Sequence, residues 1–165
     1  MNITAIDQPE LVETFLKIAK LARVDLPSSD VLSELLPAPH KRPSALPDNS
    51  QAVYAFLLSG HCLKVGKAGP KTQARFTSQH YGMNAPSTLA RSILSHRKRV
   101  AALLPRGRQH EVDALDEESI GVWIERNTTR FHVFLPTRVG ALALSLLEAF
   151  IQCRLRPLFE GKVVR

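Results

Sequence analysis

The sequence predicts a mixed α/β fold of the α+β type, with a three-stranded antiparallel sheet flanked by helices and preceded by a helical segment. Two apolar runs at residues 53–58 and 62–65 are joined by Ser59 and Gly60, and a third run at residues 129–135 alternates apolar and polar residues. Runs of strand formers linked by a two-residue turn are typical of a β-hairpin. A chain of 165 residues with 44% hydrophobic composition is long enough for one packed domain.

The N-terminal region is expected to be helical. Apolar residues at helical spacing predict a first helix between Asp7 and Leu26. A second, short helix is expected to begin at Ser28 or Ser29, whose hydroxyl can cap it, and to run through Leu36.

A proline-rich stretch separates this region from the rest of the chain. Residues 37–50 contain four prolines among polar residues, which favours a linker. We therefore expect an N-terminal segment with its linker at residues 1–45 and a main domain at residues 51–162.

The main domain is expected to contain four helices besides its strands. Apolar positions recur at helical spacing, and Pro70, Pro136 and Pro157 mark element boundaries. The expected helices span residues 71–81, 87–104, 117–125 and 142–155. Glu148 is the one acid in the last of them.

Positive charge is concentrated in the middle of the chain. The net charge is +7, and no Asp or Glu occurs between Asp48 and Glu111. A one-sign region of this kind suits a polyanion such as nucleic acid, although a solvated basic face without a partner remains an alternative. The basic residues of this window are Lys64, Lys67, Lys71, Arg75, Arg91, Arg97, Lys98, Arg99, Arg106 and Arg108.

Several classes of protein are disfavoured. No stretch approaches the roughly 18 apolar residues of a membrane span, and the N-terminus has acids where a signal peptide has a basic region. We therefore expect a cytoplasmic protein that does not contact a membrane. Cys62 and Cys153 are too few for a disulfide framework and are expected to be reduced thiols, not zinc ligands.

Four motifs occur in an order that resembles the GIY-YIG nucleases. Ala52-Val53-Tyr54 ends in a strand tyrosine, Lys64-Val65-Gly66 follows in the next strand, Arg75 lies in the helix after it, and Glu148 precedes an Arg-Pro-Leu tail. The resemblance covers the whole main domain. It implies one nuclease site built from these four segments.

The sequence also departs from the family pattern. Ala52 replaces the first glycine, Lys64 replaces the second tyrosine, and Glu160 occupies the place of a terminal asparagine. Ala52 lies at a structural position. Lys64 exchanges a hydroxyl for a cation, which can contact a phosphate or can mark a weakened enzyme.

The resemblance implies a role for each site residue. Glu148 would hold one Mg²⁺ or Mn²⁺, because a hard cation bound by few carboxylates keeps waters and takes phosphate oxygens as ligands. Tyr54 would accept the proton of the attacking water, with His80, or Tyr81 in its place, as helper. Arg75 would pair with the phosphate.

A structural alternative exists for each of these residues. Tyr54 can pack as an ordinary strand tyrosine, Arg75 can lie on a surface helix, and Glu148 can face solvent on its helix. Nucleic-acid contacts are expected from Lys67, Lys71, Arg91, Arg97, Lys98 and Arg99.

The predicted function is that of a metal-dependent endonuclease that hydrolyses phosphodiester bonds in DNA, and RNA is not excluded as a substrate. Such an enzyme would act in restriction, defence, repair or mobile-element biology. One alternative is a nucleic-acid-binding module of the same fold with weak or no catalysis. Another is a protein-interaction module. The N-terminal helices are expected to cover their own domain, to form a homodimer, to bind a protein partner or to recognise DNA.

Overall fold

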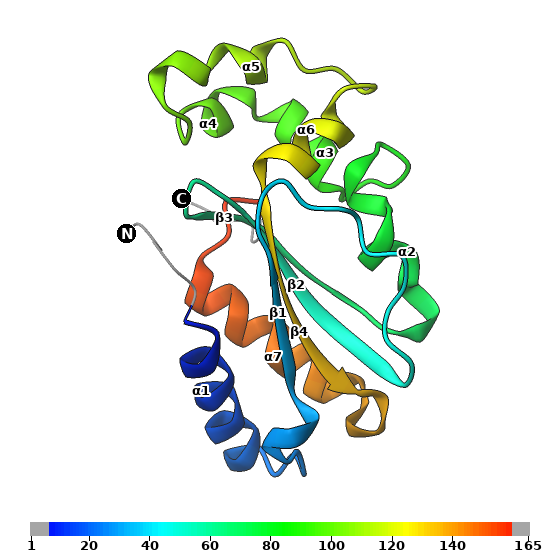
Figure 1. Cartoon of the computed structure of the whole chain (residues 1–165). Coiled ribbons are helices and arrows are strands. Elements are labelled where there is room, and N and C mark those ends of the chain that lie inside the picture. The colour runs from blue at the N-terminus through cyan, green and yellow to red at the C-terminus, as the bar shows by residue number, and fades with distance from the viewer. Residues whose placement is uncertain (1–6, 160–165) are drawn as a thin grey trace.

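A four-stranded antiparallel sheet with helices on both faces forms the centre of the computed structural model, which describes residues 7–159 (Figure 1). The strand order is β1-β4-β2-β3, with β1 at Leu32–Leu36, β2 at Ser50–Leu58, β3 at His61–Ala68 and β4 at Thr129–Pro136. The expected α+β class is confirmed, and the sheet has one strand more than predicted. Glu160 lies outside the described residues.

The predicted hairpin is present. β2 and β3 are joined by Ser59 and Gly60, whose φ angles of 49° and 78° give the left-handed conformation that a tight hairpin turn requires. β4 pairs with the other side of β2. The hairpin therefore supplies the two strands at one side of the sheet, with β3 at its edge.

The additional strand corrects a prediction. The helix expected through Leu36 is absent, because only Ser28–Asp30 form a turn of 3-10 helix and Leu32–Leu36 pair antiparallel with β4. The local sequence Leu-Ser-Glu-Leu-Leu favours a helix at least as well as a strand. Its backbone groups bond to the neighbouring strand, and this tertiary pairing outweighs local preference.

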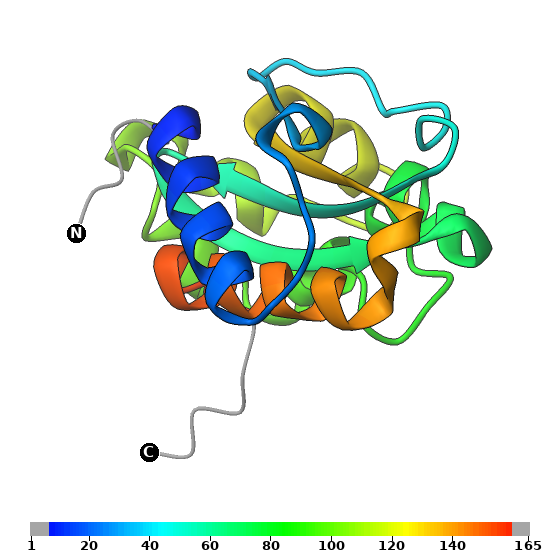
Figure 2. The ribbon, with the colours of Figure 1, turned by 90° about the horizontal axis from the view of Figure 1, so that it is seen from below.

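One face of the sheet is covered by α1 (Gln8–Leu21) and α7 (Gly140–Leu155), which lie beside each other (Figures 1 and 2). Both helices were predicted. Phe15 and Phe150 hold them together, with ring centroids 6.1 Å apart, and Glu10 pairs with Arg154. α1 thus covers its own domain. Sheet residues buried on this face include Val53, Ala55, Leu57, Val65, Phe131 and Val133.

The other face is covered by shorter helices. These are α2 (Gln73–Thr77), α3 (Leu89–Ser95), α4 (Arg97–Ala101), α5 (His110–Asp113) and α6 (Ile120–Asn127). The helix expected at residues 71–81 is divided into α2 and two flanking 3-10 turns, Pro70–Thr72 and Gln79–Tyr81. The helix expected at residues 87–104 is broken at His96, whose φ and ψ of −129° and 38° are not helical.

The proline-rich residues 37–49 connect β1 to β2 over this second face. Leu46 is buried in its core, and the backbone N–H of His40 donates to the carbonyl of Glu125 at 2.9 Å. The segment is therefore anchored to the domain. Between residues 7 and 159, no helix combines the length and apolar character needed to cross a bilayer.

Candidate active site

A pocket of about 250 Å³ opens at the edge strand β3. Its lining includes all five residues predicted to be catalytic, together with one of the predicted nucleic-acid contacts: Tyr54, Lys64, Arg75, His80, Glu148 and Lys67. These residues come from β2, β3, α2, the 3-10 turn Gln79–Tyr81 and α7. Segments that are far apart in the sequence thus converge on one cavity.

The register of the hairpin places Tyr54 in this pocket. Tyr54 lies opposite Gly66 across the β2–β3 ladder, and both face the helices α2–α6. The tyrosine ring covers the glycine so closely that a Cβ on Gly66 would lie 2.7 Å from the phenol oxygen. Gly66 is therefore required for the observed position of the ring.

His80 holds the hydroxyl group of Tyr54. The Oη atom of Tyr54 lies 2.6 Å from Nε2 of His80, and the backbone N–H of Leu89 donates to Nδ1 of His80 at 3.2 Å. A neutral imidazole carries one N–H. Since Nδ1 accepts a hydrogen bond, the proton is on Nε2, and His80 donates to the oxygen of Tyr54.

His80 is neutral at physiological pH. Burial, followed by the positive charges of Lys64, Arg130 and Arg75, lowers the pKa of His80 from 6.5 to about 3. A charged imidazole would lose its hydration in this position. The helper role predicted for His80 is therefore available to it as a hydrogen-bond donor, not as a proton acceptor.

Glu148 reaches the pocket from α7. One carboxylate oxygen lies 2.8 Å from Nζ of Lys67, which also donates to Oγ of Ser145 at 2.9 Å. Lys67 lies opposite Val53 in the register, so its side chain points to the face covered by α7. The pocket thus joins the two faces of the sheet around the end of β3.

Positive charge dominates the pocket. Glu148 is the only acid among the described residues that line it, whereas Lys64, Lys67 and Arg75 are basic. Lys64 is 5% exposed, and its ammonium donates to Oγ of Ser87 at 3.4 Å, while Arg75 is exposed. A cavity with this charge balance suits a phosphate group.

The chemistry of the donors limits how a metal ion would bind. Within residues 7–159, no three His, Cys, Asp or Glu side chains are clustered in a way that could hold a metal. A single carboxylate is compatible with Mg²⁺, which keeps several waters and binds substrate phosphates. Glu148 therefore fits a metal ion that is held jointly by the protein and a bound phosphate.

The chain was compared with models of known protein families, with curated proteins and with solved structures, and none of them matches.

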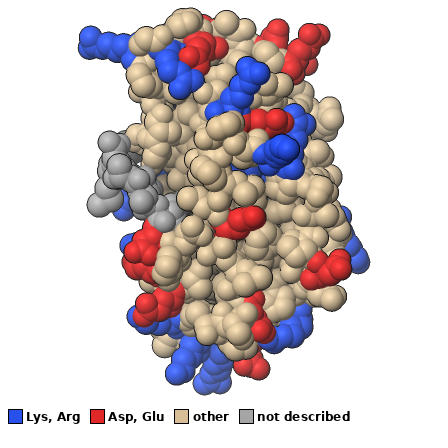
Figure 3. Space-filling view, in the orientation of Figure 1, with Lys and Arg blue, Asp and Glu red and all other residues tan. Residues whose placement is uncertain are grey.

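The other predicted nucleic-acid contacts lie outside the pocket. Lys71, Arg91, Lys98 and Arg99 are exposed, whereas Arg97 is partly buried and donates to the carbonyls of Leu94 and Leu115. On the face drawn in Figure 3, basic and acidic side chains are interspersed and no single basic patch stands out.

Some residues that support the site carry no signal in the sequence. Ser87 and Ser145 contact the two lysines, and isolated serines give no signal in a sequence. Arg130 and His132 alternate with apolar residues in β4, a pattern typical of a strand with one solvated face. Both are fully buried because helices cover both faces of the sheet.

Proposed function

We propose that this chain is a divalent-metal-dependent endonuclease of the GIY-YIG type that hydrolyses phosphodiester bonds in DNA. The observation that carries the proposal is the convergence of Tyr54, Lys64, Arg75, His80 and Glu148 on one cationic pocket. The order of these residues in the sequence resembles that nuclease family, and their shared pocket supports the resemblance.

The pocket would first bind the scissile phosphate. Lys64 and Lys67 supply compact positive charges, and the planar guanidinium of Arg75 can donate to two phosphate oxygens. Neutralising the phosphate lowers the barrier to attack by water, because negative charge increases in the transition state.

Tyr54 would then act as the general base. The oxygen of a water molecule forms a bond to phosphorus while its proton passes to the phenolate oxygen of Tyr54, and one P–O ester bond breaks. The departing alkoxide takes a proton from solvent, and Tyr54 later returns its proton to solvent. The N–H of His80 stabilises negative charge on the tyrosine oxygen through their 2.6 Å contact.

Glu148 would hold Mg²⁺ or Mn²⁺ in the pocket that it lines. When bound, the ion supplies further neutralisation of the phosphate. The ion pair with Lys67 keeps the carboxylate at this position in the absence of metal.

A cytoplasmic role in restriction, defence, repair or mobile elements is consistent with the proposed activity. We assign the wider DNA contact to the exposed residues Lys71, Arg91, Lys98 and Arg99. Such contacts predict that the logarithm of affinity falls linearly with the logarithm of salt concentration.

A nicking assay on supercoiled plasmid tests the proposal. Wild-type protein is incubated with Mg²⁺, Mn²⁺ or excess chelator, beside Glu148→Gln and Arg75→Ala and with Glu13→Gln as the matched control. Glu13 is an exposed acid on α1. We expect metal-dependent nicking by wild type and Glu13→Gln and its loss in the other two variants.

The same assay distinguishes the main alternative. The single acid in the pocket and the buried Lys64 favour, as a second candidate, a module that binds nucleic acid without cutting it. Absence of nicking with every metal, on DNA and on an RNA substrate, combined with salt-sensitive binding, would establish that alternative.

A further inference from the structure

Arg130 is a fully buried cation on β4. Its side chain lies on the sheet face that packs against α2–α6, next to the position where His132 opposes Tyr54. A buried guanidinium normally pairs with a carboxylate, because an unpaired charge loses its hydration without compensation. None of the ion pairs among the described residues involves Arg130.

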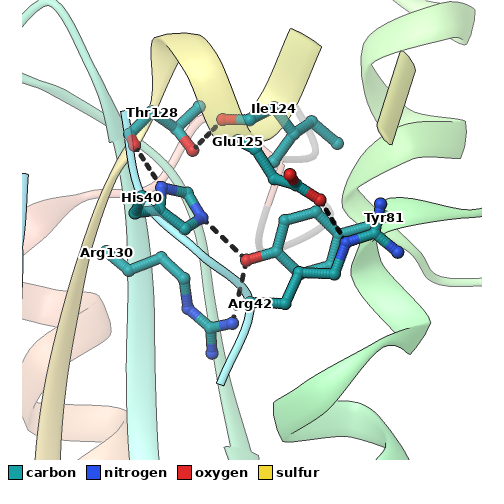
Figure 4. A network of polar contacts seen from close by, with 7 residues as sticks. All are labelled: His40, Arg42, Tyr81, Ile124, Glu125, Thr128 and Arg130. Carbon is teal, nitrogen blue, oxygen red and sulfur yellow. Dashed lines mark hydrogen bonds and ion pairs between the residues drawn. The ribbon is translucent and has the colours of Figure 1, made fainter. Parts of the chain in front are cut away.

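The hydrogen bonds of Arg130 are to uncharged groups. Nη1 donates to Oη of Tyr81 at 3.0 Å, as Figure 4 shows, and Nη2 donates to the carbonyl of Phe76 at 2.9 Å. The Nε atom has no partner among the described residues. No described carboxylate contacts the guanidinium, and the carboxylate of Glu34 on β1, which lies 3.1 Å from Nδ1 of His132, acts on it from a distance.

Aromatic rings surround the same guanidinium. Its Cζ atom lies 4.8 Å from the ring centre of Phe56, 5.1 Å from Phe76, 5.5 Å from Tyr54 and 5.9 Å from Tyr81. The negative faces of such rings attract a cation. Although burial lowers the pKa of Arg130, a guanidinium starts from so high a value that it stays protonated in proteins.

The two tyrosines beside Arg130 differ in what their hydroxyl groups can do. The Nδ1–H of His40 donates to the carbonyl of Thr128 at 2.7 Å, so its Nε2 must accept from the Tyr81 hydroxyl at 2.8 Å (Figure 4). Burial raises the pKa of Tyr81. Tyr81 therefore keeps its proton, whereas Tyr54, which is also buried, lines the pocket and has its oxygen bonded to the N–H of His80.

We infer that Arg130 is a positioning residue for Tyr54. The guanidinium packs against the tyrosine ring, and its buried positive charge favours the phenolate form of Tyr54. The inference rests on the proposed function, in which Tyr54 accepts a proton. Arg130 does not line the pocket, so it acts through residues that do, among which Tyr54 is the proposed proton acceptor.

Other charges also face Tyr54. Lys64 from β3, Arg75 from α2 and Glu148 from α7 line the same pocket, and His80 is neutral there. Arg75 is exposed, so water and salt screen its charge, whereas the charge of Arg130 is shielded from both. Arg130 is therefore expected to favour the phenolate in a way that added salt does not reduce.

The ionisation of Tyr54 can be measured directly by tyrosinate absorbance at 295 nm, in the absence of DNA and metal. The chain contains two tyrosines, so Tyr54→Phe identifies the step of Tyr54 by difference. Arg130→Met removes the charge and keeps the apolar stem, and Arg130→Lys keeps the charge. Each variant is compared with its Tyr54→Phe companion, and circular dichroism monitors folding.

We expect the midpoint of the Tyr54 step to rise by about one to two pH units in Arg130→Met, which is the effect of a unit charge at this distance in a protein interior. Arg130→Lys is expected to restore at least half of that shift. The pH–rate profile for cleavage should move upward in Arg130→Met to the same extent.

An unchanged Tyr54 step in folded Arg130→Met would overturn the inference. Loss of folding in both Arg130 variants while Tyr54→Phe folds would overturn it as well, by assigning Arg130 a purely structural role. If the step moves as expected but wild type cleaves no nucleic acid, the proposed function fails and the electrostatic coupling between Arg130 and Tyr54 stands.

Discussion

The two faces of the sheet differ in chemistry although they belong to the same four strands. The face toward α1 and α7 buries apolar side chains at its central positions, such as Val53, Ala55 and Phe131. The face toward α2–α6 buries Tyr54 and Arg130 among its aromatic residues. The comparison indicates that the first face is an apolar core and that the second holds buried polar groups beside the pocket in which we propose that the reaction occurs.

Adjacent residues of α7 separate these two roles. Leu147 is fully buried against the apolar face, so we expect Leu147→Ala to lower the free energy of unfolding by about 2–5 kcal/mol. Glu148 lines the pocket, and Glu148→Gln should change stability little. It should lower cleavage at least about a hundredfold, through loss of the proposed metal ion. Urea unfolding and single-turnover cleavage measure the two effects.

The contrast between the two faces would be wrong if Leu147→Ala and Glu148→Gln had the same effects on stability and on cleavage. A stability loss in Glu148→Gln as large as that in Leu147→Ala, with the cleavage rate of the folded fraction unchanged, would assign Glu148 to the core.

Two glycines of the same region test how closely the polar face is packed. A Cβ on Gly66 would lie 2.7 Å from the phenol oxygen of Tyr54 and 2.8–2.9 Å from two of its ring carbons, whereas nothing lies within 4 Å of a Cβ on Gly69. We expect Gly66→Ala to cost about 1–3 kcal/mol of stability by overpacking. Displacement of the ring should also lower cleavage more than about tenfold.

Gly69→Ala is the matched control, and we expect it to retain both stability and cleavage, because the φ angle of −119° at Gly69 suits any residue. Equal behaviour of the two variants would contradict the contact between Gly66 and the ring.

Much of the sheet was predictable from sequence because its signals are local. The strands of the β2–β3 hairpin carry strand formers around a two-residue turn, and β4 alternates. β1 was missed because Leu32–Leu36 form a strand through their pairing with β4, which no local pattern encodes.

The candidate site was suggested by the order of residues along the chain, and not by local signals. The order of Tyr54, Arg75 and Glu148 resembles a known family, and the structure brings these residues to one pocket. The tautomer of His80 depends on the backbone of Leu89, and the burial of Arg130 depends on helices that follow β3. Such features arise only when distant segments pack together.

The buried histidines of the polar face predict a sensitivity to acid. The pKa of His80 is lowered from 6.5 to about 3, so between these values the unfolded chain binds a proton that the folded chain does not. The contribution of neutral His80 to the free energy of unfolding is therefore fully present above pH 6.5, and it is lost as the pH falls toward 3. The loss due to His80 should be about 2 kcal/mol at pH 5.

Urea unfolding at pH 7.5 and pH 5 measures this loss. The free energy of unfolding of His80→Gln should fall by about 2 kcal/mol less than that of wild type between pH 7.5 and pH 5, because glutamine does not bind the proton. His110→Gln, at an exposed position of α5, is the control and should behave as wild type. An identical pH dependence in His80→Gln and wild type would show that His80 is not held neutral.

The most direct test of the account compares the two tyrosines in single-turnover cleavage of a DNA duplex with Mg²⁺. Tyr54 lies at the pocket, and Tyr81 keeps its proton in a bond to His40. Removing a general base typically lowers the rate by about 10²–10⁴, which we expect for Tyr54→Phe, whereas Tyr81→Phe should stay within about tenfold of wild type. Wild-type rates in folded Tyr54→Phe, or equal losses in both variants, would contradict the assignment of the polar face as the active site.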